Sequence, residues 1–176
     1  MMRGVRLPKQ LDGDPRADAL LARLANGRLL WPGGALAVAD VPLDDALARV
    51  LADAHEAGRA LRGLERATTA LDAQERGLAR ADRNAGVARG ERISRLLLLA
   101  DDGAERFYRH VESLVRRHAA RVLVLRLDVD SAALGARVFG PGASAKLVLL
   151  DHKDAVAAAL RAIADGGGGS QPGRAS

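Results

Sequence analysis

The chain contains no cysteine and very few aromatic side chains. The absence of cysteine excludes disulfides, thiolate zinc sites, iron–sulfur clusters and a cysteine nucleophile. Aromatic residues make up only 2% of the 176 residues, so the core must be built from Leu, Val, Ile and Ala. The same scarcity disfavours a surface that stacks nucleic-acid bases on aromatic rings.

Long hydrophobic runs are also missing. No window approaches the roughly 18 apolar residues that a membrane-spanning helix needs, and no apolar stretch typical of a secretory signal follows the basic start of the chain. These absences predict a cytoplasmic protein with no membrane contact. The sequence also has no G-x-G-x-x-G or P-loop motif and no metal-ligand spacing of its four histidines, so we expect no cofactor.

Lysine is scarce and arginine is abundant. The chain has 27 Lys and Arg against 22 Asp and Glu, a net charge of +5 and a pI near 10.6. A basic balance favours nucleic acid as a partner. The excess is spread thinly, however, and only three of the 27 are lysines, which fits a GC-rich coding bias better than selection for phosphate binding.

Composition divides the chain into four segments. Residues 1–41 form an N-terminal tail with a short helix at 17–25 and a β-hairpin whose turn contains Pro32-Gly33-Gly34. Residues 42–85 are helical, and residues 90–165 form an α/β domain. The Gly-rich residues 166–176 are a disordered tail.

The helical segment has an apolar position every three or four residues. Such a 3.5-residue period is the pattern of a coiled coil. The segment could fold back as a hairpin near Thr68–Asp72, pair with a second copy or a partner helix through Leu43–Leu71, or lie on the sheet as one amphipathic helix. The positions are Leu43, Leu47, Val50, Ala54, Ala57, Leu61, Leu64, Thr68 and Leu71.

The α/β domain contains three apolar runs, at 95–100, 121–129 and 145–151, each followed by a helical pattern. Apolar runs without polar alternation are typical of strands covered on both faces. The sequence therefore predicts a mainly parallel β-α-β-α-β-α unit in a three-layer α/β/α arrangement.

Each predicted strand ends in acidic residues, which parallel strands would bring to one edge of the sheet. The simplest interpretation is helix capping: Asp101 or Asp102 for the first helix, Asp130 or Ser131 for the second, Asp151 for the third. The alternative is a Mg²⁺ site for phosphoryl transfer, formed by Asp101, Asp128 and Asp130.

The first helix of this unit has two distinct sides. Its apolar side, predicted to face the sheet, carries Phe107, Val111, Leu114, Val115 and His118. A second side carries basic residues that could follow a phosphate backbone or simply face solvent: Arg106, Arg109, His110, Arg116 and Arg117.

Residues 90–165 resemble the kink-turn-binding family of ribosomal proteins, a fold also found in pelota. The matching pieces are a strand closing in Ala-x-Asp at Ala100–Asp102, a helix, a strand, a short helix with Leu134-Gly135, a Gly-containing turn, and a strand ending in Asp151. The resemblance implies a three-layer domain that binds bent RNA. It also implies RNA contacts from three places. One is a Gly-x-Asn-Glu-x-x-Lys helix start, for which only Gly90-Glu91-Arg92 is found; the others are the loop after the Ala-x-Asp strand, Asp102–Gly103, and the loop after the Leu-Gly helix, Gly140–Ser144.

The resemblance and the basic helix side together define the candidate RNA-binding residues, with no catalytic residue among them. The leading hypothesis is a non-enzymatic module that binds RNA or a ribonucleoprotein. The alternatives are a scaffold that oligomerises through Leu43–Leu71, and the Mg²⁺-dependent enzyme. A four-stranded mixed sheet with a helix beginning near Gly86 would favour the RNA-binding family. A parallel sheet whose acidic side chains converge within about 5 Å would favour the metal site. The candidate residues are Arg92, Asp102, Gly103, Arg106, Arg109, Arg116, Arg117, Gly140, Gly142 and Ser144.

Overall fold

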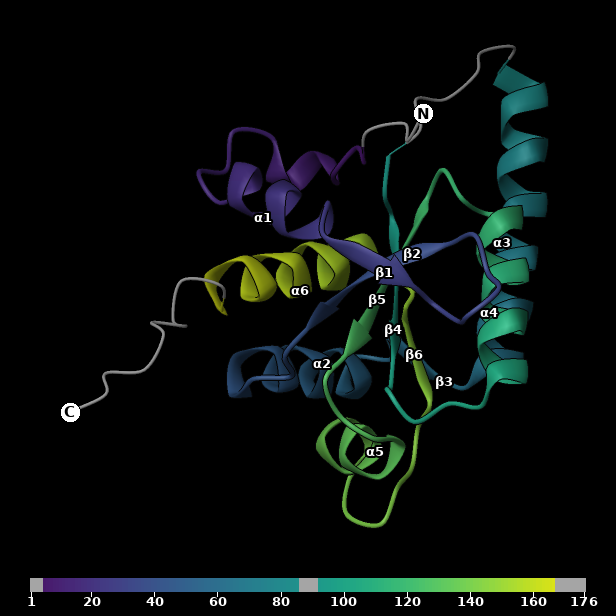
Figure 1. Cartoon of the computed structure of the whole chain (residues 1–176). Coiled ribbons are helices and arrows are strands. Elements are labelled where there is room, and N and C mark those ends of the chain that lie inside the picture. The colour runs from purple at the N-terminus through teal and green to yellow at the C-terminus, as the bar shows by residue number, and fades with distance from the viewer. Residues whose placement is uncertain (1–4, 86–91, 167–176) are drawn as a thin grey trace.

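The three aliphatic runs form the centre of a six-stranded sheet in the computed structural model, which describes residues 5–85 and 92–166 (Figure 1). They are β4 (Arg95–Leu99), β5 (Val122–Leu127) and β6 (Leu147–Leu150), as predicted. The strand order is β1-β2-β5-β4-β6-β3, so strands from three of the predicted segments share one sheet.

The sheet is mixed. β4 is parallel to β5, but β6 is antiparallel to β4, so the expectation of a mainly parallel unit is wrong for its third strand. An apolar run carries no information on direction, since both faces of the strand are covered either way. The reversal moves Asp151 to the opposite edge from Asp101 and Asp128, where it accepts a hydrogen bond from Arg95 Nε at 2.8 Å.

The predicted hairpin is confirmed. Strands β1 (Gly27–Leu29) and β2 (Ala37–Val41) pair in antiparallel fashion, and β2 joins the sheet parallel to β5. The buried carboxylate of Glu112 accepts hydrogen bonds from the amides of Ala35 and Leu36 at 2.9 and 2.6 Å, which fastens the hairpin loop to the helix containing residue 112.

The prediction that residues 42–85 are helical throughout is wrong, and the alternative of a turn near Thr68–Asp72 is also wrong, because these residues lie within one helix. The segment forms α2 (Asp45–Glu56), the edge strand β3 (Ala60–Arg62) and α3 (Leu64–Ala85), with β3 antiparallel to β6. Gly58 and Gly63 have φ values of +74° and +96°, which place a glycine-favouring turn before and after the strand. Leu47 and Leu71 from the predicted seam therefore lie in different hydrophobic clusters on opposite faces of the sheet.

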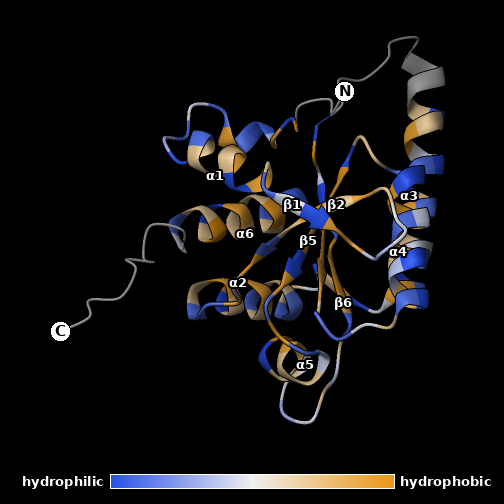
Figure 2. Cartoon of the chain, in the orientation of Figure 1, coloured by the Kyte–Doolittle hydropathy of each residue, from blue (hydrophilic) through white to orange (hydrophobic). Residues whose placement is uncertain are grey.

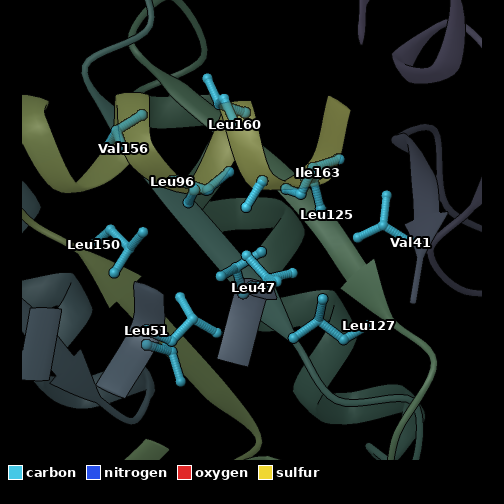
Figure 3. Close-up of a cluster of buried hydrophobic side chains, with 14 of the residues drawn as sticks. Val41, Leu47, Leu51, Leu96, Leu125, Leu127, Leu150, Val156, Leu160 and Ile163 are labelled. Carbon is cyan, nitrogen blue, oxygen red and sulfur yellow. The ribbon is translucent and has the colours of Figure 1, made fainter. Parts of the chain in front are cut away.

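Helices cover both faces of the sheet and complete three layers (Figures 1 and 2). Helices α1 (Ala17–Leu24), α2, α5 (Ser131–Phe139) and α6 (Lys153–Gly166) contribute to one core cluster, shown in part in Figure 3. Helices α3 and α4 (Glu105–Arg117) contribute to the other. Side chains of β4 alternate between the two, with Leu96 and Leu98 in the first and Leu97 and Leu99 in the second.

Two further expectations concern helices and termini. The short helix predicted at 17–25 is confirmed as α1. No helix within the described residues is long and apolar enough to span a membrane. Most of the predicted tail, residues 167–176, lies outside the described residues.

Candidate nucleic-acid interface

Four connections meet at one edge of the sheet, at the lower end in Figure 1. They are residues 62–66, 101–104, 128–131 and 140–146, and we call them the loop edge. Backbone hydrogen bonds join three of them: the Asp101 amide donates to the Val129 carbonyl at 2.9 Å, and the Ala145 amide to the Ser131 carbonyl at 2.9 Å. The Gly63 amide of the fourth donates to the carbonyl of Leu147, the first residue of β6, at 3.0 Å. This convergence follows from the strand directions, because β4 and β5 end where the antiparallel β6 begins and β3 ends.

Tyr108 holds the connection that follows β4. Its hydroxyl donates to the carbonyl of Ala100 at 2.8 Å and accepts from the amide of Gly103 at 3.0 Å. Burial of the ring raises the pKa of Tyr108, so the hydroxyl stays protonated and keeps both bonds at neutral pH. A Cβ at Gly103 would lie 2.7 Å from the Phe107 ring, which explains the glycine in this tight turn.

Asp102 joins this connection to the one after β5. Its carboxylate accepts hydrogen bonds from the amide and the hydroxyl of Ser131 at 3.0 and 2.9 Å. Desolvation of Asp102 raises its pKa, but the two Ser131 bonds, a bond from its own backbone amide and the charge of Lys146 together lower it more, so the net pKa lies below the ordinary value. Asp102 therefore stays charged in the pH range of most cells.

The capping predictions have a mixed outcome. Asp130 caps α5 as expected, since its carboxylate accepts from the Ala133 amide at 2.7 Å. Neither Asp101 nor Asp102 caps α4, whose N-cap is Ala104 without a side-chain hydrogen bond. At α6 the Asp154 amide donates to His152 Nδ1 at 3.1 Å, while Asp151 is paired with Arg95, so the prediction of Asp151 as the cap is wrong.

The connection between α5 and β6 packs tightly on the Leu134-Gly135 pair. Leu134 is fully buried, and a Cβ at Gly135 would clash with the Ala143 carbonyl oxygen and the Ser144 Cα. The predicted tight turn is present, with φ values of +114° at Gly140 and +81° at Gly142. Gly135 thus allows the loop to cross the helix at close range and fixes its position at the loop edge.

The loop edge carries charges of both signs. Its basic side chains include Arg62, Arg66 and Lys146, none of which is among the residues predicted from the sequence. The available signal was Gly63, a glycine between the apolar pair Ala60-Leu61 and a helical pattern, but the heptad interpretation spanned it. Arg62 lies over the Phe139 ring at 5.5 Å, which ties β3 to α5. The exposed acids at the edge are Glu65, Asp101, Asp102, Asp128 and Asp130.

The basic side of α4 is exposed, as predicted, and its apolar side packs on the sheet. Arg109 donates to Glu105 at 2.6 Å and lies 4.7 Å from the Trp31 ring centroid. Arg116 and Arg117 lie at the far end of the helix from the loop edge, 3.7 Å from Glu112 and 3.5 Å from Asp72. Arg106, in the first turn, is the candidate on this helix closest to the loop edge along the chain.

The structure separates Arg92 from the candidates at the loop edge. Arg92 precedes β4 at the opposite edge of the sheet, and its guanidinium donates to Asp12 at 2.9 Å. The assignment of Arg92 to the same site as Asp102 and Gly140 is therefore wrong. Gly90 and Glu91, the rest of the predicted helix start, lie outside the described residues.

The alternative metal site gains no support from the geometry. Asp130 is occupied as the α5 cap, while Asp101 and Asp128 are exposed. Across residues 5–85 and 92–166, no group of three or more His, Asp or Glu side chains is arranged to hold a metal ion.

Comparisons with known proteins add little to this geometry. No protein-family model matches the chain, and no curated protein matches its sequence. Among solved structures, a protein of unknown function from Bacillus halodurans is similar, with 13% identity and a TM-score of 0.42 over 67% of this chain and 99% of that one. Any inference about function must therefore rest on the residues and geometry of the loop edge.

Proposed function

We propose that the chain is a non-enzymatic module that binds structured RNA at the loop edge. The observation that carries the proposal is the convergence of residues 101–104 and 140–146 at one edge of a mixed sheet. These are the two connections from which the family resemblance implies RNA contacts. The sheet is mixed, as expected for the RNA-binding family, but it has six strands instead of the expected four, and the helix start expected near Gly86 lies outside the described residues.

The third segment implied by the resemblance is a helix start, and α3 supplies one at this edge. Gly63 precedes α3 directly, and its amide bonds to the first residue of β6. The segment Gly63-Leu64-Glu65-Arg66 keeps the glycine of the motif but not its Asn, Glu or Lys at the corresponding places. We therefore propose recognition of structured RNA in general, not of the kink-turn in particular.

The charges of the loop edge suit the bases as well as the backbone of RNA. Arg62, Arg66 and Lys146 can bind phosphates, while exposed carboxylates such as Asp101 and Asp128 can accept hydrogen bonds from the amino groups of unpaired bases. An interface of mixed sign gains less from counterion release than a purely basic one, so the expected affinity depends on the RNA structure and only moderately on salt.

The alternative of self-association through Leu43–Leu71 has less support. Leu43, Leu47, Ala54 and Leu71 are buried in the chain's own core and are not available to a partner. A cytoplasmic location is part of the RNA-binding proposal, because structured RNA is available there.

The proposal is tested by fluorescence anisotropy with a labelled RNA hairpin that contains an asymmetric internal loop. We expect micromolar binding to this RNA and at least tenfold weaker binding to a fully paired duplex of the same length, because unpaired bases are needed. Equal affinity for both RNAs would indicate unspecific phosphate binding, and no binding at low salt would refute the proposal.

A further inference from the structure

Three side chains from different elements meet beside the loop edge. The guanidinium of Arg62, the last residue of β3, lies over the Phe139 ring, 5.5 Å from its centroid. The ring of His55, in the last turn of α2, contacts the same ring with centroids 4.7 Å apart and an interplanar angle of 78°. Phe139 ends α5 and directly precedes the connection 140–146. We call these three side chains the Phe139 platform, and it borders one of the two connections on which the proposed RNA site depends.

The guanidinium of this platform is accessible. Arg62 is exposed, and its side chain makes no hydrogen bond or ion pair with any residue within 5–85 and 92–166. It belongs to β3, which stands at one end of the strand order, so the next strand of the sheet lies on one side of it only. The Phe139 ring therefore supports the guanidinium from one face, and the side chain stays open to a ligand.

A second arginine in contact with an aromatic ring differs in this respect. Arg109 lies 4.7 Å from the Trp31 ring centroid, but its guanidinium donates a hydrogen bond to Glu105 at 2.6 Å. A carboxylate bound to a guanidinium takes up its charge and part of its N–H donors. Arg62 has no such partner in the described part of the chain, so it offers a planar face together with its donors.

We propose that the Phe139 platform stacks one unpaired base of the RNA, an inference that rests on the proposed function. Guanidinium planes and aromatic rings are the groups on which proteins stack unpaired RNA bases. The base lies on the face of Arg62 that points away from the Phe139 ring, while Arg66 and Lys146 are available to the phosphates on either side of it. Because arginine supplies the stacking plane, one aromatic ring is sufficient, and a chain with few aromatic residues can form the site.

Arg62→Lys separates stacking from charge, because lysine keeps the positive charge that a phosphate needs but has no planar face. We expect the hairpin with the asymmetric internal loop to bind about tenfold more weakly, as for the loss of one stacked base. Phe139→Leu removes the supporting ring and should weaken binding similarly, with thermal unfolding as the check that it folds. The matched control Arg49→Lys changes an exposed arginine of α2 that has no ring contact within the described residues, and it should leave the affinity unchanged.

Fluorescence of 2-aminopurine, placed in turn at each unpaired position of the RNA, reports the stacking itself. At saturating protein we expect one position to differ between the complexes with wild type and Arg62→Lys, and Arg49→Lys to match wild type. An abasic site at that position should weaken wild type about tenfold and Arg62→Lys no further.

The outcomes distinguish this inference from the proposed function. If the hairpin binds but wild type and Arg62→Lys have equal affinity, or no position responds to Arg62→Lys, the platform is overturned and the loop edge stays the RNA site. If no RNA binds at low salt, both are refuted.

Discussion

The hydroxyl of Tyr108 accepts a hydrogen bond from the backbone amide of Gly103 at 3.0 Å and at the same time donates to the carbonyl of Ala100. One side chain of α4 thus fixes both ends of a connection at the loop edge. Tyr108→Phe removes both bonds and leaves two backbone groups without their partner. We expect a loss of about 2 kcal/mol in the free energy of unfolding, measured by urea denaturation with the fluorescence of the single Trp31.

The same variant should weaken RNA binding, because the connection loses its fixed position. An unchanged unfolding midpoint together with unchanged RNA affinity would show that Tyr108 does not hold the loop.

Gly135 provides a test of the close contact between α5 and the loop that follows it. In Gly135→Ala the new Cβ would clash with backbone atoms of Ala143 and Ser144, so the loop must move. We expect a destabilisation of about 2 kcal/mol and a weaker RNA complex. Thermal unfolding and anisotropy measure the two effects.

Gly77→Ala is the matched control for that change. Gly77 lies in α3, where an added Cβ would meet no described atom within 4 Å, so alanine brings only its higher helix propensity. We expect a gain of about 0.5–1 kcal/mol and an unchanged RNA affinity. Destabilisation by both variants to the same degree would show that the contact at residues 143–144 is not the cause.

Glu112 makes stability depend on pH. Its burial raises the pKa, but the hydrogen bonds from the Leu36 and Ala35 amides and the charge of Arg116 together lower it more, so the pKa in the folded protein lies below the value of 4.5 for a free glutamate. A lowered folded-state pKa stabilises the protein above the pKa of the unfolded chain, and this stabilisation is lost as the pH falls through the folded-state value.

Glu112→Gln should therefore destabilise the protein by about 1–2 kcal/mol at pH 7 and by much less near pH 3. Urea denaturation at several pH values measures the difference. Glu105→Gln, at an exposed position of the same helix, is the control for the removal of a carboxylate from α4. A constant difference between Glu112→Gln and wild type from pH 7 to pH 3 would contradict this account.

Much of the fold follows from local sequence patterns. The runs that became β4, β5 and β6 are aliphatic and bounded by polar residues, and Pro32-Gly33-Gly34 marks the hairpin loop. The sequence did not predict the three-residue strand β3, because apolar residues continue at intervals of three and four residues across Gly58 and Gly63. Its pairing with β6 is a long-range contact that no local pattern contains.

The positions of charged residues in the sheet and at the candidate site were harder to predict from the sequence, for the same reason. Arg126 interrupts an aliphatic strand, and its burial depends on Asp40, which lies opposite it in the register of β2 and β5 and accepts from its Nε at 2.7 Å. Likewise, the place of Arg92 and Lys146 at opposite edges depends on the direction of β4 and β6. Register and direction arise from pairing between distant segments, so sequence periodicity cannot supply them.

The most direct measurement of the central claim is the mapping of backbone amide chemical shifts during titration with the RNA hairpin. Binding at the loop edge predicts the largest changes at Gly63, Asp102, Gly103 and the 140–144 loop, with small changes in α1 and α2. Changes confined to the outer side of α4 or to the Arg92 edge, with the loop edge unaffected, would contradict it.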